Sequence, residues 1–222
     1  MITIAVDGPA GAGKSSVSKA VAKALGIIYI DTGAMYRASA LYAIKNGIEI
    51  TPENMDKCLD KIDIDIAYDE RGQRIFLNGE DVSERIREKD VSLGASDIAV
   101  IPAVRLKLVD LQRALSKKQS VIMDGRDIGT YVLPDADVKI FLTATSLERA
   151  RRRCLEMSEK GIDCDLMEVQ RDIEYRDKQD SSREFAPLKQ ADDAVLIDSS
   201  NMSFDEVVAK VIETIKNSGA EV

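Results

Sequence analysis

The chain has 222 residues, a hydrophobic content of 45% and a formal net charge of −8, which suits one α/β domain with one or two insertions. No apolar run approaches the roughly 18 residues of a membrane-spanning helix, so we expect no membrane partner. The acidic balance disfavours a nucleic acid polymer as partner, because affinity for a polyanion comes mainly from Lys and Arg. The chain has no histidine, so any chemistry falls to Asp, Lys, Arg and Mg²⁺.

The cysteines predict free thiols. Cys58, Cys154 and Cys164 are odd in number and lack C-x-x-C spacing, which argues against a disulfide framework or a zinc site. The first residues form neither the charged nor the apolar region of a signal peptide. We therefore expect a cytoplasmic protein, and a monomer, since no exposed apolar stripe stands out.

Residues 8–15, GPAGAGKS, fit the phosphate-binding pattern G-x-x-x-x-G-K-[ST]. An apolar run precedes the pattern and a helical one follows it, with Gly26 where a helix should end. Backbone N–H groups of such a loop surround a polyphosphate, Lys14 reaches the β- and γ-phosphates, and Ser15 offers its hydroxyl to Mg²⁺. The residues expected to bind ATP are Gly8, Pro9, Ala10, Gly11, Ala12, Gly13, Lys14, Ser15 and Ser16.

The next elements alternate between strand and helix. A strand is expected over 27–30 and a helix from there to near Gly47, which indicates parallel strands joined by crossover helices. A helix starting at Thr51 then leads to alternating apolar residues over 62–66 and to Asn78-Gly79, a strong hairpin signal. We assign residues 51–91 to an antiparallel β insertion and residues 1–50 and 92–222 to the core domain.

The second half returns to the parallel rhythm. Two helical stretches meet near Pro102, and buried-type strands are expected over 120–123, 138–142 and 195–198. Two basic helices on either side of Gly161 predict a hinged lid over about 146–185. The expected fold is α/β with a phosphate loop (P-loop), about five parallel strands flanked by helices, a small antiparallel β insertion and a helical lid.

The phosphate loop is common to motors, switches and small-molecule kinases, and the positions of the arginines along the chain help to distinguish these classes. A guanidinium binds phosphate in a bidentate manner, so convergent arginines would form a second pocket that binds an anion. Each of these arginines taken alone is equally typical of an exposed surface residue. The candidates for this pocket are Arg37, Arg105, Arg126, Arg176 and Arg183. On the first lid helix, Arg149 and Arg153 lie four residues apart, and either this pair or Arg152 is expected to neutralise the transferred phosphoryl group.

Three carboxylates follow strands or accompany arginines. Asp124 ends a strand and is expected to hold the water shell of Mg²⁺ with Ser15, although Asp also commonly caps helices and strands. Asp127 and Asp180 are close to arginines in the sequence, and one interpretation is that each forms a structural ion pair. A carboxylate paired with an arginine can also recognise the edge of a nucleotide base. The carboxylate then accepts a hydrogen bond from an exocyclic amine of the base, and the arginine donates to a ring nitrogen or oxygen.

Several motifs together resemble bacterial cytidylate kinases. They are the phosphate loop, DTGAMYR at 31–37, DGRDIGT at 124–130, PDA at 134–136, KIFL at 139–142 and APL at 186–188. The resemblance covers nearly the whole chain in order. It implies the α/β fold of a P-loop kinase, with a five-stranded parallel sheet, a lid and a β insertion that binds the monophosphate. It also implies transfer of the ATP γ-phosphoryl group to CMP and dCMP.

The resemblance also implies roles for individual residues. Lys14 and Arg126 act in catalysis with the lid arginines. The acceptor phosphate is gripped by Thr32, Arg37, Arg126 and Arg183, cytosine is read by Ser96, Arg105 and Asp127, and the ribose contacts Arg176 and Asp180. Lys178, Ser181 and Ser182 depart from the more arginine-rich lid of the family. A UMP/CMP kinase, another small-molecule P-loop kinase and a nucleotide-dependent ATPase switch remain the alternatives.

Overall fold

The computed structural model describes residues 1–70 and 72–220. The chain forms two compact units. The first contains Met1–Tyr29 and the chain from Gln119 onward, and the second contains Ile30–Lys118. The segment 51–91 lies within the second unit, and its role in binding a monophosphate stays a prediction.

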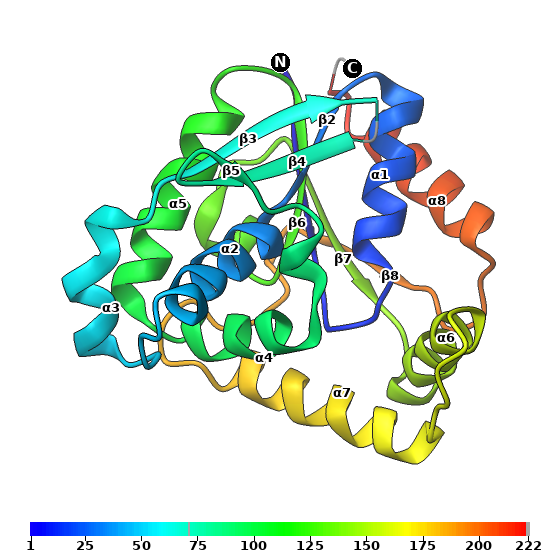
Figure 1. Ribbon diagram of the computed structural model, residues 1–222. Helices are drawn as coiled ribbons and strands as arrows, with labels where there is room; N and C mark the ends of the chain where they lie inside the picture. Colours follow the sequence, from blue (N-terminus) through cyan, green and yellow to red (C-terminus); the bar gives the residue numbers. More distant parts are fainter. Residues whose placement is uncertain (71, 221–222) are drawn as a thin grey trace. The chain divides into compact units, whose positions relative to one another are not determined.

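The expected five-stranded parallel sheet is present in the order β2-β6-β1-β7-β8 (Figure 1). Its strands are β1 (Thr3–Asp7), β2 (Ile28–Asp31), β6 (Val121–Gly125), β7 (Val138–Thr143) and β8 (Val195–Asp198). The central strand β1 pairs in parallel with β6 and β7, so Asp7 lies opposite Gly125 and Phe141. Polar residues at the ends of these strands therefore meet at the carboxyl edge of the sheet, where α/β proteins bind ligands.

Helices α1 (Lys14–Leu25) and α8 (Phe204–Asn217) cover the sheet and contribute to one apolar core. Val17 and Val21 of α1 and Val211 and Ile215 of α8 pack with the strand residues of the first unit. The predicted capping box of Ser203 and Glu206 starts α8. This packing fixes the start of α1 at the edge of the sheet, directly after the phosphate loop.

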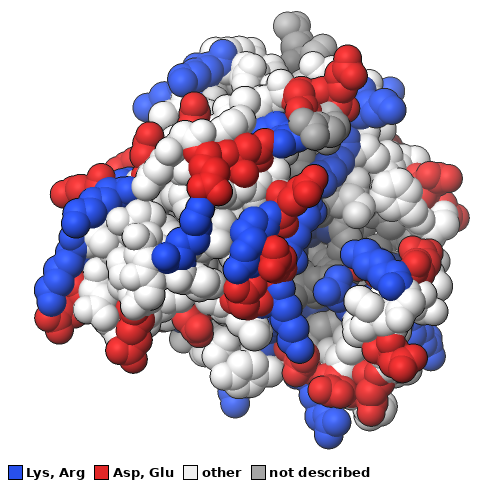
Figure 2. All heavy atoms as spheres, viewed as in Figure 1, with Lys and Arg blue, Asp and Glu red and all other residues white. Residues whose placement is uncertain are grey.

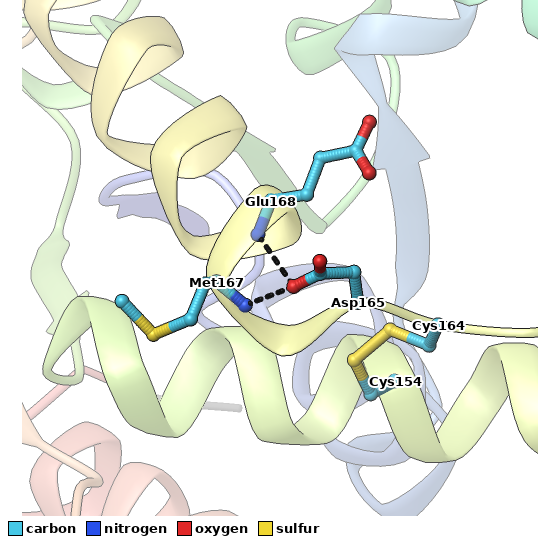
Figure 3. The surroundings of a disulfide bond; sticks show 5 residues. All are labelled: Cys154, Cys164, Asp165, Met167 and Glu168. Atoms are coloured by element: carbon cyan, nitrogen blue, oxygen red, sulfur yellow. Dashed lines mark hydrogen bonds between the residues drawn. A yellow bond between two sulfur atoms is a disulfide. The ribbon is translucent and has the colours of Figure 1, made fainter.

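Helices α6 (Ser146–Glu159) and α7 (Leu166–Ser181) form the helical hairpin expected for the lid (Figure 1). The prediction of three free thiols is wrong, because Cys154 of α6 and Cys164 before α7 form a disulfide, with their Cα atoms 5.4 Å apart. The turn reverses the chain between the helices and brings the two thiols together. Asp165 caps α7 beside the disulfide by accepting from the N–H groups of Met167 and Glu168 (Figure 3).

In the part of the chain that the structure describes, the second unit combines four α-helices with the predicted antiparallel β structure. Its elements are α2 (Thr32–Lys45), α3 (Pro52–Cys58), β3 (Ile64–Asp69), β4 (Gly72–Leu77), β5 (Glu80–Asp81), α4 (Lys89–Ile98) and α5 (Pro102–Ser116). Asn78 and Gly79, both with positive φ, make the expected turn between β4 and β5. Helix α4 lies close to α2, because a Cβ on Gly94 would be 3.4 Å from the Cβ of Ala40.

The described charges alternate in sign over the face shown in Figure 2. Acidic side chains lie among the basic ones there. Among the residues that the structure describes, no helix has the length and apolar character needed to cross a bilayer.

Candidate active site

The phosphate loop runs from the end of β1 to the start of α1, as the pattern predicted. A Cβ on Gly8 would lie 1.9 Å from the backbone oxygen of Leu142, so only glycine lets the loop pass this close to β7. Gly13 caps α1 with a left-handed φ of 86°. The N-terminal end of α1 therefore faces the space that the loop encloses, and its partial positive charge favours an anion there.

Lys14 is buried at the start of this helix. Its Nζ donates a 2.7 Å hydrogen bond to the carbonyl oxygen of Pro9 in the loop. Burial, and next the charge of Arg126, lower the pKa of Lys14 well below its usual value. An ammonium group held in this way gains from an incoming polyphosphate, which replaces the lost solvation with direct charge pairing.

Ser15 and Asp124 meet beside the loop. The Ser15 hydroxyl donates a 2.6 Å hydrogen bond to Oδ2 of Asp124, and the Tyr29 hydroxyl donates to Oδ1 at 2.9 Å. Asp124 is 5% exposed near the end of β6. These oxygen atoms suit Mg²⁺, which usually takes one or two protein ligands and completes its octahedron with water and phosphate. Accordingly, the absence of any group of three or more metal-ligating residues among the described residues does not argue against such a site.

Arg126, Asp180 and Arg183 form a cluster between the loop after β6 and the end of α7. The Nε of Arg126 lies 2.7 Å from Oδ2 of Asp180, while Arg183 binds Oδ1 of the same carboxylate. Burial alone would raise the pKa of Asp180, but Arg126 and then Arg183 outweigh it, and the net direction is downward. Asp180 thus stays ionised and orients both guanidinium groups.

Among the four arginines of α6, Arg149 is the one that contacts the phosphate loop. It donates to the carbonyl oxygen of Ala10 at 2.8 Å and pairs with Asp177 of α7 at 2.7 Å. Asp177 in turn accepts from the N–H of Ala10 at 3.1 Å, so the two helices hold the Ala10 peptide from both sides.

The other two candidate lid arginines point elsewhere in this conformation. Arg152 binds Glu148 and the hydroxyl and carbonyl oxygens of Ser199, after β8. Arg153 is exposed and pairs with Glu156. The catalytic roles given to Arg149, Arg152 and Arg153 stay predictions.

Four predicted acceptor-binding residues lie in the second unit. Thr32 is buried at the start of α2, and Arg37 pairs with Asp31 at 2.8 Å. Arg105 is 1% exposed, donates to the carbonyl oxygen of Ala99 at 3.0 Å and lies over the ring of Tyr36. Ser96 is half-buried on α4. The acceptor-binding roles of these four residues stay predictions.

The remaining predicted residues belong to the first unit. Asp127 is buried after β6, whereas Ser16 and Arg176 are exposed on α1 and α7. The sequence reasoning missed Asp7, whose two carboxylate oxygens accept from the N–H groups of Ile128 and Gly129 at 2.8 and 2.7 Å. It also missed Tyr29 and Asp177. The one local signal for Asp7 was an acidic residue at the end of a buried strand, immediately before the loop.

The fold and the site define a P-loop kinase: a glycine-rich loop at the carboxyl edge of a parallel sheet, a buried lysine and an arginine-bearing helical hairpin in the same unit. The family profile described as cytidylate kinase matches residues 4–217, and the chain belongs to that family. It is 54% identical over 213 residues to a cytidylate kinase of Caldicellulosiruptor saccharolyticus, covering 96% of this chain and 94% of the relative. A cytidylate kinase of Lactobacillus johnsonii is 49% identical over 217 residues, with 97% and 94% covered.

Solved structures support the fold alone. A gluconokinase of Sinorhizobium meliloti superimposes with a TM-score of 0.51 at 14% identity, covering 97% of this chain and 92% of that one. An uncharacterized protein of Eubacterium ventriosum gives a TM-score of 0.56, also at 14% identity, with 97% and 99% covered.

Proposed function

We propose that this protein transfers the γ-phosphoryl group of ATP to CMP and dCMP, which gives ADP and CDP or dCDP. The observation that carries the proposal is membership of the cytidylate kinase family across residues 4–217, with the complete phosphate loop in place. Neither the family match nor the site favours a nucleotide-dependent switch, because a switch has no phosphorylated acceptor for a second set of arginines to bind.

The donor nucleotide would occupy the loop formed by residues 8–15. Backbone N–H groups and the start of α1 would bind the phosphates, and Lys14 would reach the β- and γ-phosphates. Lys14 lies in the buried part of this loop and already donates to a carbonyl oxygen that a phosphate oxygen can replace as acceptor. Arg126 and Arg149 would then stabilise charge on the transferred group.

We assign the phosphate of the acceptor to Thr32, Arg37, Arg126 and Arg183, its cytosine to Ser96, Arg105 and Asp127, and its ribose to Arg176 and Asp180. The acceptor phosphate is itself the nucleophile and is anionic near neutral pH, so no protein general base is required. This explains how a chain without histidine can carry out the reaction.

The proposal includes Mg²⁺ bound with ATP, and Ser15 and Asp124 would hold it. When bound, the ion neutralises charge on the β- and γ-phosphates. We further propose a monomer that acts in the cytoplasm. A reducing cytoplasm would convert Cys154 and Cys164 into two thiols.

A coupled assay of ADP formation tests the proposal. ATP and Mg²⁺ are supplied with CMP, dCMP, UMP, AMP or GMP, each offered separately. We expect rates that depend strongly on CMP and dCMP, with UMP far behind. Equal rates with UMP would favour a UMP/CMP kinase, and a slow rate that ignores every acceptor would indicate an ATPase. Lys14→Ala should lose about 10³-fold or more in turnover while staying folded, and Lys23→Ala at the other end of α1 is the control.

A further inference from the structure

Asp7 is a buried carboxylate that the reaction scheme above does not use. It ends β1 directly before Gly8, is 4% exposed, and uses each of its oxygens for a different backbone donor. The N–H of Ile128 lies 2.8 Å from Oδ1 and that of Gly129 lies 2.7 Å from Oδ2. The strand that supplies the phosphate loop is thereby tied to the segment that carries Asp127.

The segment that Asp7 holds has an unusual backbone. Residues Ile128–Val132 form a single π-helical turn, and the carbonyl oxygen of Asp127 accepts from the N–H groups of both Tyr131 and Val132. Such turns are rare and are frequently found at functional sites. The fit is close, because a Cβ on Gly129 would lie 3.4 Å from Oδ2 of Asp7 and 3.2 Å from Cδ of Lys139. The first two N–H groups of the turn thus both donate to Asp7, and little space is left around Gly129.

Burial makes a charged carboxylate at this position electrostatically unfavourable. Burial raises the pKa of Asp7 to about 6, in spite of its two backbone donors. The charge of Asp127 adds to this rise and the charge of Lys14 opposes it, so Asp7 lies within electrostatic reach of both. An ionised group retained at such a cost is typical of a functional site.

We propose that Asp7 is a positioning residue that sets the Asp127 backbone, and with it the carboxylate of Asp127, for recognition of the acceptor base. This inference rests on the proposed function, in which Asp127 reads the amino group of cytosine. Two N–H donors side by side require two acceptors, and a carboxylate supplies both from one side chain. Asp7 therefore acts through Asp127 and does not touch the substrate.

Asp7→Asn tests this assignment, since it removes one acceptor and turns an amide donor toward a backbone N–H. We expect the KM for CMP to rise about 10-fold, as the loss of one hydrogen bond to a charged acceptor implies. The preference for CMP over UMP in kcat/KM should fall by a similar factor, while the KM for ATP changes less than about 3-fold. The matched control is Asp137→Asn. Asp137 precedes β7, and its carboxylate also accepts from a backbone N–H, that of Thr3 at the other end of β1. The control should keep the parental preference.

A double-mutant cycle with Asp127→Ala decides the mechanism. If Asp7 acts through Asp127, adding Asp7→Asn to Asp127→Ala should reduce the preference for CMP by less than about 2-fold further. Full additivity of the two effects, or a parental preference in Asp7→Asn, would overturn the positioning role. If Asp127→Ala itself leaves the preference unchanged, the base-reading role of Asp127 fails instead, so the two failures are distinguishable.

Asp7→Ser keeps the test decisive should the asparagine variant fail to fold. Serine offers one acceptor oxygen and no amide donor, and circular dichroism confirms folding before kinetics. The same loss of CMP preference is expected. A serine variant that folds and shows equal losses toward ATP, CMP and UMP would indicate a general structural role and overturn the proposal.

Discussion

The hydroxyl of Ser15 lies 2.6 Å from a carboxylate oxygen of Asp124, although the two residues are 109 positions apart in the chain. One comes from the phosphate loop and the other from the neighbouring strand β6. The pair joins the two oxygen types that P-loop enzymes use for a nucleotide-bound cation. Tyr29 donates to the other oxygen of Asp124 and so fixes the orientation of the carboxylate.

Asp124→Asn should weaken the binding of Mg²⁺, because it removes the negative charge beside Ser15. We expect kcat/KM to fall about 100-fold at 1 mM Mg²⁺ and to recover partly at higher concentrations. Titration of the coupled assay with Mg²⁺ measures this. Tyr29→Phe keeps the carboxylate and is the control, with an effect below about 5-fold. An unchanged Mg²⁺ titration in Asp124→Asn would contradict the metal assignment.

Asp177→Ala should destabilise the first unit, because it leaves the guanidinium of Arg149 buried without its carboxylate. We expect a loss of roughly 3 kcal/mol in the free energy of unfolding, measured with urea. Arg153→Ala removes an exposed ion pair with Glu156 on the same helix and should cost less than about 0.5 kcal/mol. Equal losses in the two variants would show that the pair of Arg149 and Asp177 does not stabilise the fold.

The pKa of Asp7 predicts a pH-dependent stability. Because this pKa is raised from 3.8 to about 6, the folded chain binds more protons than the unfolded chain between these values. The contribution of Asp7 to the free energy of unfolding is therefore largest below pH 3.8 and decreases as the pH rises to about 6. Across the whole window the decrease is about 3 kcal/mol, of which about 1 kcal/mol falls between pH 5 and pH 7.

Urea unfolding of the wild type and of Asp7→Asn at pH 5 and pH 7 measures this decrease. The wild type should lose about 1 kcal/mol relative to the variant over that range. Asp137→Asn is the control, because the N–H of Thr3 lowers the pKa of Asp137 and moves its titration below pH 3.8. A stability difference between wild type and Asp7→Asn that stays constant from pH 5 to pH 7 would show that Asp7 titrates normally.

Reduction of the disulfide should loosen the hairpin of α6 and α7. The bond joins residues ten positions apart, and a loop of this length implies a stabilisation of about 2–3 kcal/mol for the hairpin. Proteolysis of the hairpin with and without dithiothreitol measures the change. Cys154→Ser should be insensitive to the reductant, and equal sensitivity of this variant would refute the role of the bond. Denatured protein should show one reactive thiol, from Cys58, before reduction and three after it.

Local features could be predicted from the sequence because neighbouring residues determine them. The phosphate loop depends on glycines spaced along eight consecutive residues, and the turn between β4 and β5 depends on Asn78 and Gly79 alone. The parallel sheet followed from the alternation of buried-type strands with helical patterns. The resemblance to cytidylate kinases rested on short motifs of the same kind, and the family match confirmed it.

The sequence by itself thus determined the fold class, the phosphate loop and the family. Tertiary structure alone decided which polar side chains meet. Asp7 contacts Ile128 across 121 positions, and Ala10 contacts Asp177 across 167, so no local pattern encodes either pair. The same holds for Arg149, because the direction of one arginine among four depends on the packing of α6 and α7 beside the loop. The disulfide likewise arises from the reversal of the chain at the hairpin, since cysteine spacing without geometry cannot specify a bond.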